Sequence, residues 1–147
     1  MRPTIYGGLL SQDIHLKVVQ QSGRDTASSG SKWEPKMGYS RAVRSGNTIA
    51  VSGTVGINAD GTYSKSLAEQ TRRSLAIITA AVELLGGKPE HIIRTRLYVT
   101  DVTKWEEVAV VHGEIFAAVR PATAIVQVAK LIDAEAQIEI EADAIVP

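Results

Sequence analysis

The sequence of 147 residues contains no cysteine. Disulfide bonds, a thiolate nucleophile, an iron–sulfur cluster and a cysteine-rich zinc site are therefore excluded. The 16 basic and 16 acidic residues leave no formal net charge, so no overall positive field is available to hold nucleic acid. No stretch approaches the ~20 apolar residues of a membrane span, and residues 1–22 lack the unbroken apolar run of a signal peptide. We expect a cytoplasmic protein without nucleic-acid or membrane partners.

Several catalytic motifs are also missing. Residues 112–114 contain the His-x-Glu of zinc deaminases, but the Pro-Cys-x-x-Cys that completes that site cannot exist here. The three histidines lack the spacing of metal ligands. Ser52 lacks the preceding Gly-x of a nucleophile elbow, and no glycine-rich phosphate loop leads from a strand into a helix. We therefore expect neither a metal nor a cofactor.

The first part of the chain differs from the rest. Residues 22–32 are small and polar, which is typical of a linker, and residues 14–19 could form one short strand. We therefore divide the chain into an N-terminal arm and linker, residues 1–35, and one folded domain, residues 36–147.

From residue 39 the patterns become regular. Residues 39–44 and 48–55 surround a Ser-Gly-Asn turn and predict a hairpin. Ser66 and Glu69 form a capping box that opens a helix. One apolar stripe continues along this helix to a Gly-Gly pair, and a proline follows. The stripe consists of Leu67, Thr71, Leu75, Ile78, Val82 and Leu85.

The second half continues the alternation of strands and helices. Residues 92–100 predict a strand, and Thr103 with Glu106 forms a second capping box. That box opens a helix to about residue 118, whose inward side chains are Val108, Val111, Ile115 and Phe116. Residues 122–129 and 137–146 predict two more strands. The order ββαβαββ indicates an α+β domain, a mixed sheet with two helices on one face.

The face without helices is the expected location of a site. We place on it Thr123, Ile125 and Gln127 from one strand and Glu139 and Glu141 from another, because each group alternates along its strand. Residues 94–98 and 39–41 add arginine and tyrosine side chains to this set. A symmetric oligomer would cover the apolar part of such a face, and a polar cluster beside a subunit interface would bind a small molecule.

Glu139 is the candidate acid or base of this cluster. A carboxyl group buried in a cleft keeps its proton to higher pH and can exchange it near neutrality. The alternative interpretation is that Glu139 and Glu141 are solvated or ion-paired strand residues.

Three motifs resemble the reactive-intermediate deaminase family, RidA, also called YjgF-like. They are the hairpin residues 38–53, the strand 94–101, and the C-terminal stretches 120–128 and 137–142. The match runs in order from about Gly38 to Val146, roughly three quarters of the chain.

The resemblance implies a chorismate-mutase-like fold that assembles as a homotrimer, with sites in clefts between subunits. Members of this family hydrolyse reactive enamines and imines, such as 2-aminoacrylate, to 2-keto acids and ammonia without a cofactor. The family's site tyrosine, serine and glutamate fall on Tyr39, Ser52 and Glu139. The arginine that binds the substrate carboxylate falls on Thr123, so the chain resembles a branch that lacks this arginine.

A threonine hydroxyl does not replace a bidentate cation, and loss of such a contact costs roughly 2–5 kcal/mol. Arg96 is the first candidate to compensate, followed by Arg120 and Arg41. A neutral substrate held by hydroxyl groups, Gln127 and backbone donors is the alternative. Tyr98, which alternates with Arg96, completes the expected substrate-binding set.

We therefore expect a small-molecule hydrolase or deaminase that acts on an enamine, imine or related carbonyl compound, and not a standard 2-aminoacrylate deaminase. The alternative is a trimer that binds or senses a metabolite without catalysis. RNA cleavage is a third hypothesis, because some relatives carry an endoribonuclease label, but the neutral charge disfavours it.

Overall fold

A computed structural model describes residues 13–147, so the expectation about a targeting segment at the N-terminus falls largely outside the described residues. The elements are β1 (Lys17–Gln21), β2 (Arg24–Ser28), α1 (Trp33–Met37), β3 (Ala42–Ser45), β4 (Thr48–Val55), α2 (Leu67–Leu84), η1 (Pro89–His91), β5 (Ile92–Val99), η2 (Val102–Lys104), α3 (Trp105–Phe116), β6 (Ala122–Gln127) and β7 (Ile138–Ile145). The predicted order ββαβαββ is confirmed from β3 onward.

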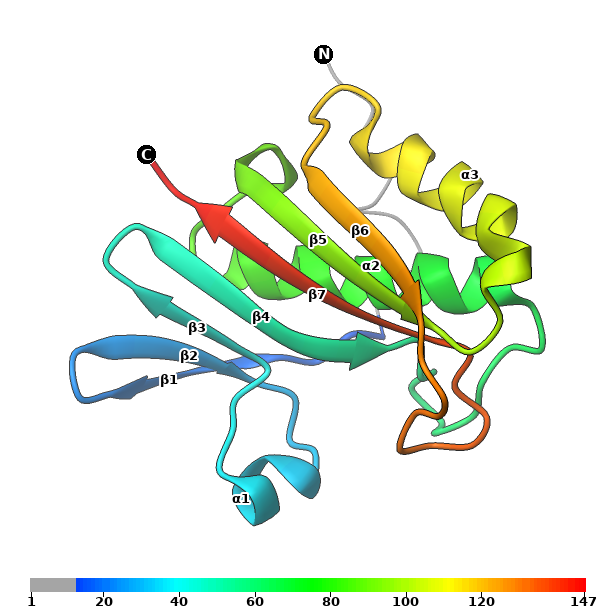
Figure 1. Cartoon of the computed structure of the whole chain (residues 1–147). Helices are drawn as coiled ribbons and strands as arrows, with labels where there is room; N and C mark the ends of the chain where they lie inside the picture. The colour runs from blue at the N-terminus through cyan, green and yellow to red at the C-terminus, as the bar shows by residue number, and fades with distance from the viewer. Residues whose placement is uncertain (1–12) are drawn as a thin grey trace.

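The strands form one mixed sheet in the order β1-β2-β3-β4-β7-β5-β6. Every neighbouring pair is antiparallel except β5 and β6, which are parallel and are joined through η2 and α3. Helix α2 runs behind the sheet in Figure 1. The last strand, β7, occupies the middle of the sheet between β4 and β5, so it pairs with strands formed much earlier in the chain.

The expected linker at residues 22–32 is wrong in its middle. Residues 24–28 form β2, which makes a hairpin with β1 and extends the sheet beyond β3 (Figure 1). Ala27 lies opposite Ala42 of β3, and both side chains are fully buried. Small residues are needed there because the hairpin packs closely on the core, and this is why the segment looks like a linker in sequence. The short strand expected at 14–19 is confirmed as β1, displaced toward residue 21.

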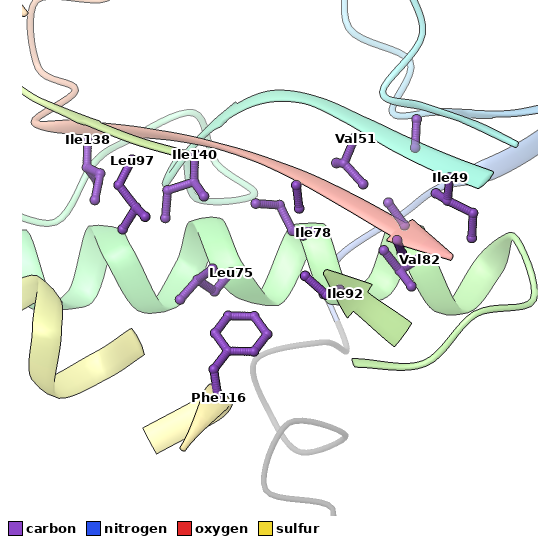
Figure 2. Close-up of a cluster of buried hydrophobic side chains, with 14 of the residues drawn as sticks. Ile49, Val51, Leu75, Ile78, Val82, Ile92, Leu97, Phe116, Ile138 and Ile140 are labelled. Atoms are coloured by element: carbon purple, nitrogen blue, oxygen red, sulfur yellow. The ribbon is translucent and has the colours of Figure 1, made fainter. Parts of the chain in front are cut away.

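Helix α2 begins and ends as predicted. The Ser66 hydroxyl accepts a hydrogen bond from the Glu69 backbone N–H at 3.3 Å. The whole predicted stripe is buried, at most 5% exposed. Gly86 ends the helix with φ 88°, a left-handed conformation that favours glycine. Figure 2 shows Leu75, Ile78 and Val82 of α2 within the buried cluster, with Leu75 on the side of Phe116 from α3.

Helix α3 starts later than its predicted cap. Asp101, rather than Thr103, is the capping residue, and its carboxylate accepts from the Thr103 N–H at 3.1 Å. The first turn after Asp101 is therefore the 3₁₀ helix η2, and α3 follows at Trp105. Of the predicted inward residues, Val108, Val111 and Phe116 are buried and Ile115 is half-buried.

The side chains of β7 alternate between the two faces of the sheet. Ile138, Ile140, Ala142 and Ala144 are fully buried in one core cluster with α2 and α3, whereas the acidic residues between them are half-exposed. The two longer helices therefore cover one face, as predicted. Neither of them, nor any other helix in residues 13–147, is long and apolar enough to cross a membrane.

The expected face of β6 is wrong. Thr123 and Gln127 lie opposite Thr95 and Val99 of β5 in parallel register, and these β5 residues point into the helix-covered core. Ile125 packs against the same core. Strand alternation shows which residues share a face but not which face is covered, and an edge strand with apolar residues on both faces does not resolve this.

Candidate functional site

A cavity of about 840 Å³ opens beside the second half of β4, beyond the residues that pair with β3. Tyr39, just before β3, and Ser52, on β4, line it from one side of the sheet, and Glu139 lines it from β7. Three of the residues predicted for the site are therefore brought together.

Glu139 lies against the backbone of β4. The register between β4 and β7 shifts between Val51 and Thr54, and Glu139 lies opposite Val55. A Cβ atom added to Gly53 would lie 2.9 Å from Glu139 Cδ, closer than such atoms approach. Because Gly53 has no side chain, the Glu139 carboxyl has room to lie against the backbone at this position.

The environment of Glu139 favours its protonated form. Burial raises the pKa of the Glu139 carboxyl above its ordinary value; the Arg41 charge opposes this rise and Glu141 adds to it. Glu141 also lines the cavity. A carboxyl group whose pKa is raised in this way can accept and return a proton at higher pH than an exposed glutamate.

Arg41 is the cation nearest to this carboxyl in the cavity wall. Its Nη2 donates to the Gly53 carbonyl at 2.6 Å, and its guanidinium lies 5.7 Å from the centre of the Tyr39 ring. Its buried Nε has no hydrogen-bond partner. Among residues 13–147 no carboxylate lies within 4.0 Å of Arg41 to form an ion pair. The guanidinium therefore retains unused donor capacity beside the cavity.

Ser52 is less available than its place suggests. Its hydroxyl donates to the Ser40 carbonyl at 2.6 Å, so its proton is already engaged in holding the hairpin. The Ser52 oxygen can still accept a hydrogen bond. Ser52 is thus a lining residue of the cavity.

Arg96 and Tyr98 are on the same sheet face but outside the cavity lining. Arg96 Nη1 lies 3.1 Å from Asp143 and 3.6 Å from Glu141, so its charge is neutralised locally. Tyr98 lies opposite Glu139 in the β5–β7 register, and a hydrogen bond to Glu141 raises the pKa of its hydroxyl. Arg96 is thus ion-paired within the chain, whereas the role predicted for it, to bind the substrate in place of the missing arginine, needs a cation that is free to do so.

Thr123 is turned away from Glu139. Thr95 Oγ1 lies 2.8 Å from Thr123 Oγ1 and 2.9 Å from His112 Nε2, so the three side chains form one chain of hydrogen bonds. Thr123 also donates to the Pro121 carbonyl at 3.1 Å. Burial lowers the pKa of His112, which keeps the imidazole neutral.

The two remaining predicted residues serve helix ends. Gln127 Oε1 accepts from the Val102 N–H at 3.0 Å, at the start of η2. Arg120 has φ 56°, and its N–H donates to the Phe116 carbonyl after α3. Its side chain is exposed, and neither residue lines the cavity of its own chain.

Sequence reasoning missed part of the cavity wall. Gly53 carries no signal of its own, and Arg41 was only a third alternative although it alternates with Tyr39. Residues 13–16 and 29–31 also line the cavity, and these lie in the segment expected to be an arm and linker. Within residues 13–147 no group of three or more histidine or acidic side chains is placed to hold a metal ion.

Comparisons with known proteins identify similar chains. The sequence model of the family described as Endoribonuclease L-PSP matches residues 30–146. The 2-iminobutanoate/2-iminopropanoate deaminase of Escherichia coli K12 is 34% identical over 73% of this chain and 86% of its own length. An uncharacterized Streptomyces coelicolor protein, SCO2049, is 32% identical over 79% and 87%.

Solved structures agree with the fold. Rv2704 of Mycobacterium tuberculosis, described as a member of the YjgF/YER057c/UK114 family, is 43% identical and covers 84% of this chain and 99% of its own, with a TM-score of 0.78. The YjgF gene product of E. coli is 34% identical, with 73% and 87% covered and a TM-score of 0.69. These likenesses confirm the expected α+β, chorismate-mutase-like fold.

Proposed function

Because the chain belongs to the Endoribonuclease L-PSP family, also called RidA or YjgF, we propose that it hydrolyses small imines or enamines to carbonyl compounds and ammonia. The observation that carries this proposal is Glu139: a half-buried carboxyl with a raised pKa, held beside Arg41 in the cavity wall. The deaminase of E. coli supports the reaction class.

Glu139 is the group that moves protons. In its ionised form it accepts a proton from a water molecule whose oxygen bonds to the imine carbon, while the C=N π electrons move to nitrogen. Glu139 then delivers that proton to the nitrogen. In the second half, the carbinolamine hydroxyl loses its proton through Glu139 to nitrogen, C=O forms, and the C–N bond breaks. One imine and one water give one carbonyl compound and one ammonia.

Arg41 supplies the cation that Thr123 does not. Its partly unpaired guanidinium can hold an anionic or carbonyl group of the substrate, while the neighbouring Tyr39 ring forms part of the same wall. This assignment replaces Arg96, whose charge is already paired with Asp143.

We further propose that the chain works as a homotrimer whose subunits meet at the sheet face without helices. The half-exposed acidic and arginine side chains of β5 and β7 on that face, and the exposed edge strand β6, support such contacts. Light scattering should then give about three times the chain mass of 15.8 kDa; a single-chain mass would contradict the assembly.

The test is hydrolysis of imines made in place by an L-amino-acid oxidase with catalase. The protein should form 2-keto acid faster than buffer alone, and Glu139→Gln should lower kcat/KM by about 10²- to 10⁴-fold. The wild-type profile should rise with pH, with its midpoint above the ordinary glutamate value of 4.5. Glu107→Gln, an exposed residue on α3, is the matched control. No rate above buffer would exclude the proposal.

Metabolite binding without turnover remains the second candidate, and the size of the cavity supports it. Saturable binding combined with an absent hydrolysis rate would favour it. RNA cleavage is opposed by the absence of a formal net charge, which leaves no overall positive field to hold phosphate.

A further inference from the structure

The cavity wall combines large apolar side chains with polar and charged ones. Trp33, Ile57 and Ile132 line it while remaining 39%, 37% and 83% exposed, and Ile77 of α2 closes its floor. Exposed large apolar side chains that gather at one place mark a binding surface more often than scattered ones do. These apolar residues line the same cavity as Tyr39, Arg41 and Glu139.

The N-terminal segment before β1 completes this apolar wall. Asp13 pairs with Arg73 of α2 at 2.6 Å, and Arg73 Nε donates to the Ile57 carbonyl at 3.0 Å. These contacts hold Ile14 and Leu16 against the cavity. The family match starts only at residue 30, so this part of the wall is an addition to the common domain.

The volume also exceeds what a three- or four-carbon substrate needs. A cavity of about 840 Å³ lies near the upper end of the ~300–1,000 Å³ range of pockets that enclose drug-sized ligands. A small imino acid bound at Glu139 would leave the apolar side chains of this chain's wall without contact to the substrate. A substrate with an apolar side chain would bury that surface instead.

We propose that the preferred substrate is an imine or enamine that carries a branched aliphatic or aromatic side chain. This inference rests on the proposed function: the reacting carbon lies at Glu139, and the side chain occupies the compartment lined by Ile14, Leu16, Trp33, Ile57, Ile77 and Ile132. Specificity for the side chain is a property of the N-terminal segment and the loops around it.

Hydrolysis of a series of imines tests the preference. The oxidase can make them from L-alanine, L-leucine and L-phenylalanine, and kcat/KM should be at least about tenfold higher for the two larger imines than for the alanine imine. Equal or lower values for the larger imines would overturn the inference and leave the proposed function intact. No hydrolysis of any imine would instead overturn the proposed function.

Binding of the 2-keto products tests the inference without turnover. Trp105 is exposed on α3 and lies outside the cavity lining, so a Trp105→Phe variant leaves Trp33 as the only tryptophan reporter. Its fluorescence should respond to 4-methyl-2-oxopentanoate at a concentration at least about tenfold lower than to pyruvate. Equal affinities would count against an apolar compartment even if the enzyme is active.

A pair of variants locates the compartment. Ile132→Ser should weaken binding of 4-methyl-2-oxopentanoate about tenfold and leave pyruvate binding unchanged, since its side chain touches only the tail. Ile132 is 83% exposed, so the variant should fold. Val110→Ser, on the exposed face of α3, is the control and should change neither. If Ile132→Ser changes the oligomer mass and not the affinity, the apolar patch is a subunit contact and the inference is wrong.

Discussion

Two polar regions of this sheet contrast in how far their groups satisfy one another. In the Thr123 region, Thr95, Thr123 and His112 are neutral and each is hydrogen-bonded to the next. In the Glu139 region, a half-buried carboxyl with a raised pKa faces a guanidinium with which it forms no close ion pair. The first arrangement is complete without a ligand, whereas the second retains unused hydrogen-bonding capacity.

This difference shows which of the two polar regions keeps hydrogen-bonding capacity for a ligand. Thr123 occupies the position expected for a substrate-binding arginine, yet within its own chain it is bonded to Thr95 and to Pro121. Arg41 is only the third candidate for that role from the sequence, yet no carboxylate among residues 13–147 forms an ion pair with it and its charge acts on Glu139. The variants below separate the two regions, from the largest expected effect to the smallest.

Gly53→Ala should have the largest effect on activity, because it acts on the position of the Glu139 carboxyl. The new Cβ would approach Glu139 Cδ to 2.9 Å, so the carboxyl must move away from the reacting carbon. A displacement of this kind lowers kcat/KM by about 100-fold. Gly113→Ala is the matched control, since its Cβ meets nothing within 4 Å and should stabilise α3 by about 0.5–1 kcal/mol. Full activity in Gly53→Ala would show that Glu139 is not the reacting group.

Thr95→Val should lower the stability of the fold by removing the hydroxyl that links Thr123 to His112. The variant leaves His112 Nε2 without its partner in a half-buried position, so the free energy of unfolding should fall by about 1–3 kcal/mol. Urea denaturation measures this change. Thr48→Val, at an exposed hydroxyl on β4, should stay within about 0.5 kcal/mol. Equal effects of the two variants would mean that the hydrogen-bond chain contributes nothing.

Arg41→Gln should sharpen the assignment of charge. Because the Arg41 charge lowers the Glu139 pKa, its removal should move the acidic limb of the kcat/KM profile to higher pH and reduce the rate at pH 7 by about tenfold. Arg41→Lys should keep the limb near its original position. The exposed Arg24→Gln on β2 removes the same charge elsewhere and should leave the limb in place. An unshifted limb in Arg41→Gln would rule out this electrostatic coupling.

The smallest expected effect is the pH dependence carried by His112. Its folded pKa is lowered by burial, so the unfolded chain binds a proton more readily and the folded state loses stability as the pH falls below about 6.5. Between pH 7.5 and 5.5 the wild type should therefore lose more unfolding free energy than His112→Gln. Chemical denaturation at the two pH values measures the difference. Parallel losses in both proteins would contradict a buried, neutral imidazole.

Local signals were sufficient for the elements of the common domain. The Ser66 cap and the stripe of α2, and the alternation of β7, each fix one side of the core by periodicity alone. The hairpin of β1 and β2 escaped because Ala27 packs by being small, and small polar stretches are also typical of linkers. The spacing of Thr103 and Glu106 predicts a cap at Thr103, but the carboxylate of Asp101, two residues earlier, caps the first turn instead.

For the site, the sequence identified Tyr39, Ser52 and Glu139 but not their surroundings. Which face β6 presents depends on its pairing with β5, a tertiary fact that alternation does not contain. The contribution of residues 13–16 depends on an ion pair with α2, far along the chain. Such contacts form between segments that are far apart in the chain, so no local sequence pattern predicts them.

The central position of β7 has a consequence for synthesis. Until this strand leaves the ribosome, β4 and β5 lack the neighbour that joins them, and the apolar stripe of α2 has no complete surface to cover. Glu139 arrives on the same strand. A nascent chain that stops before β7 therefore lacks both a complete core and the carboxyl group proposed to react, so the proposed activity would require a finished fold.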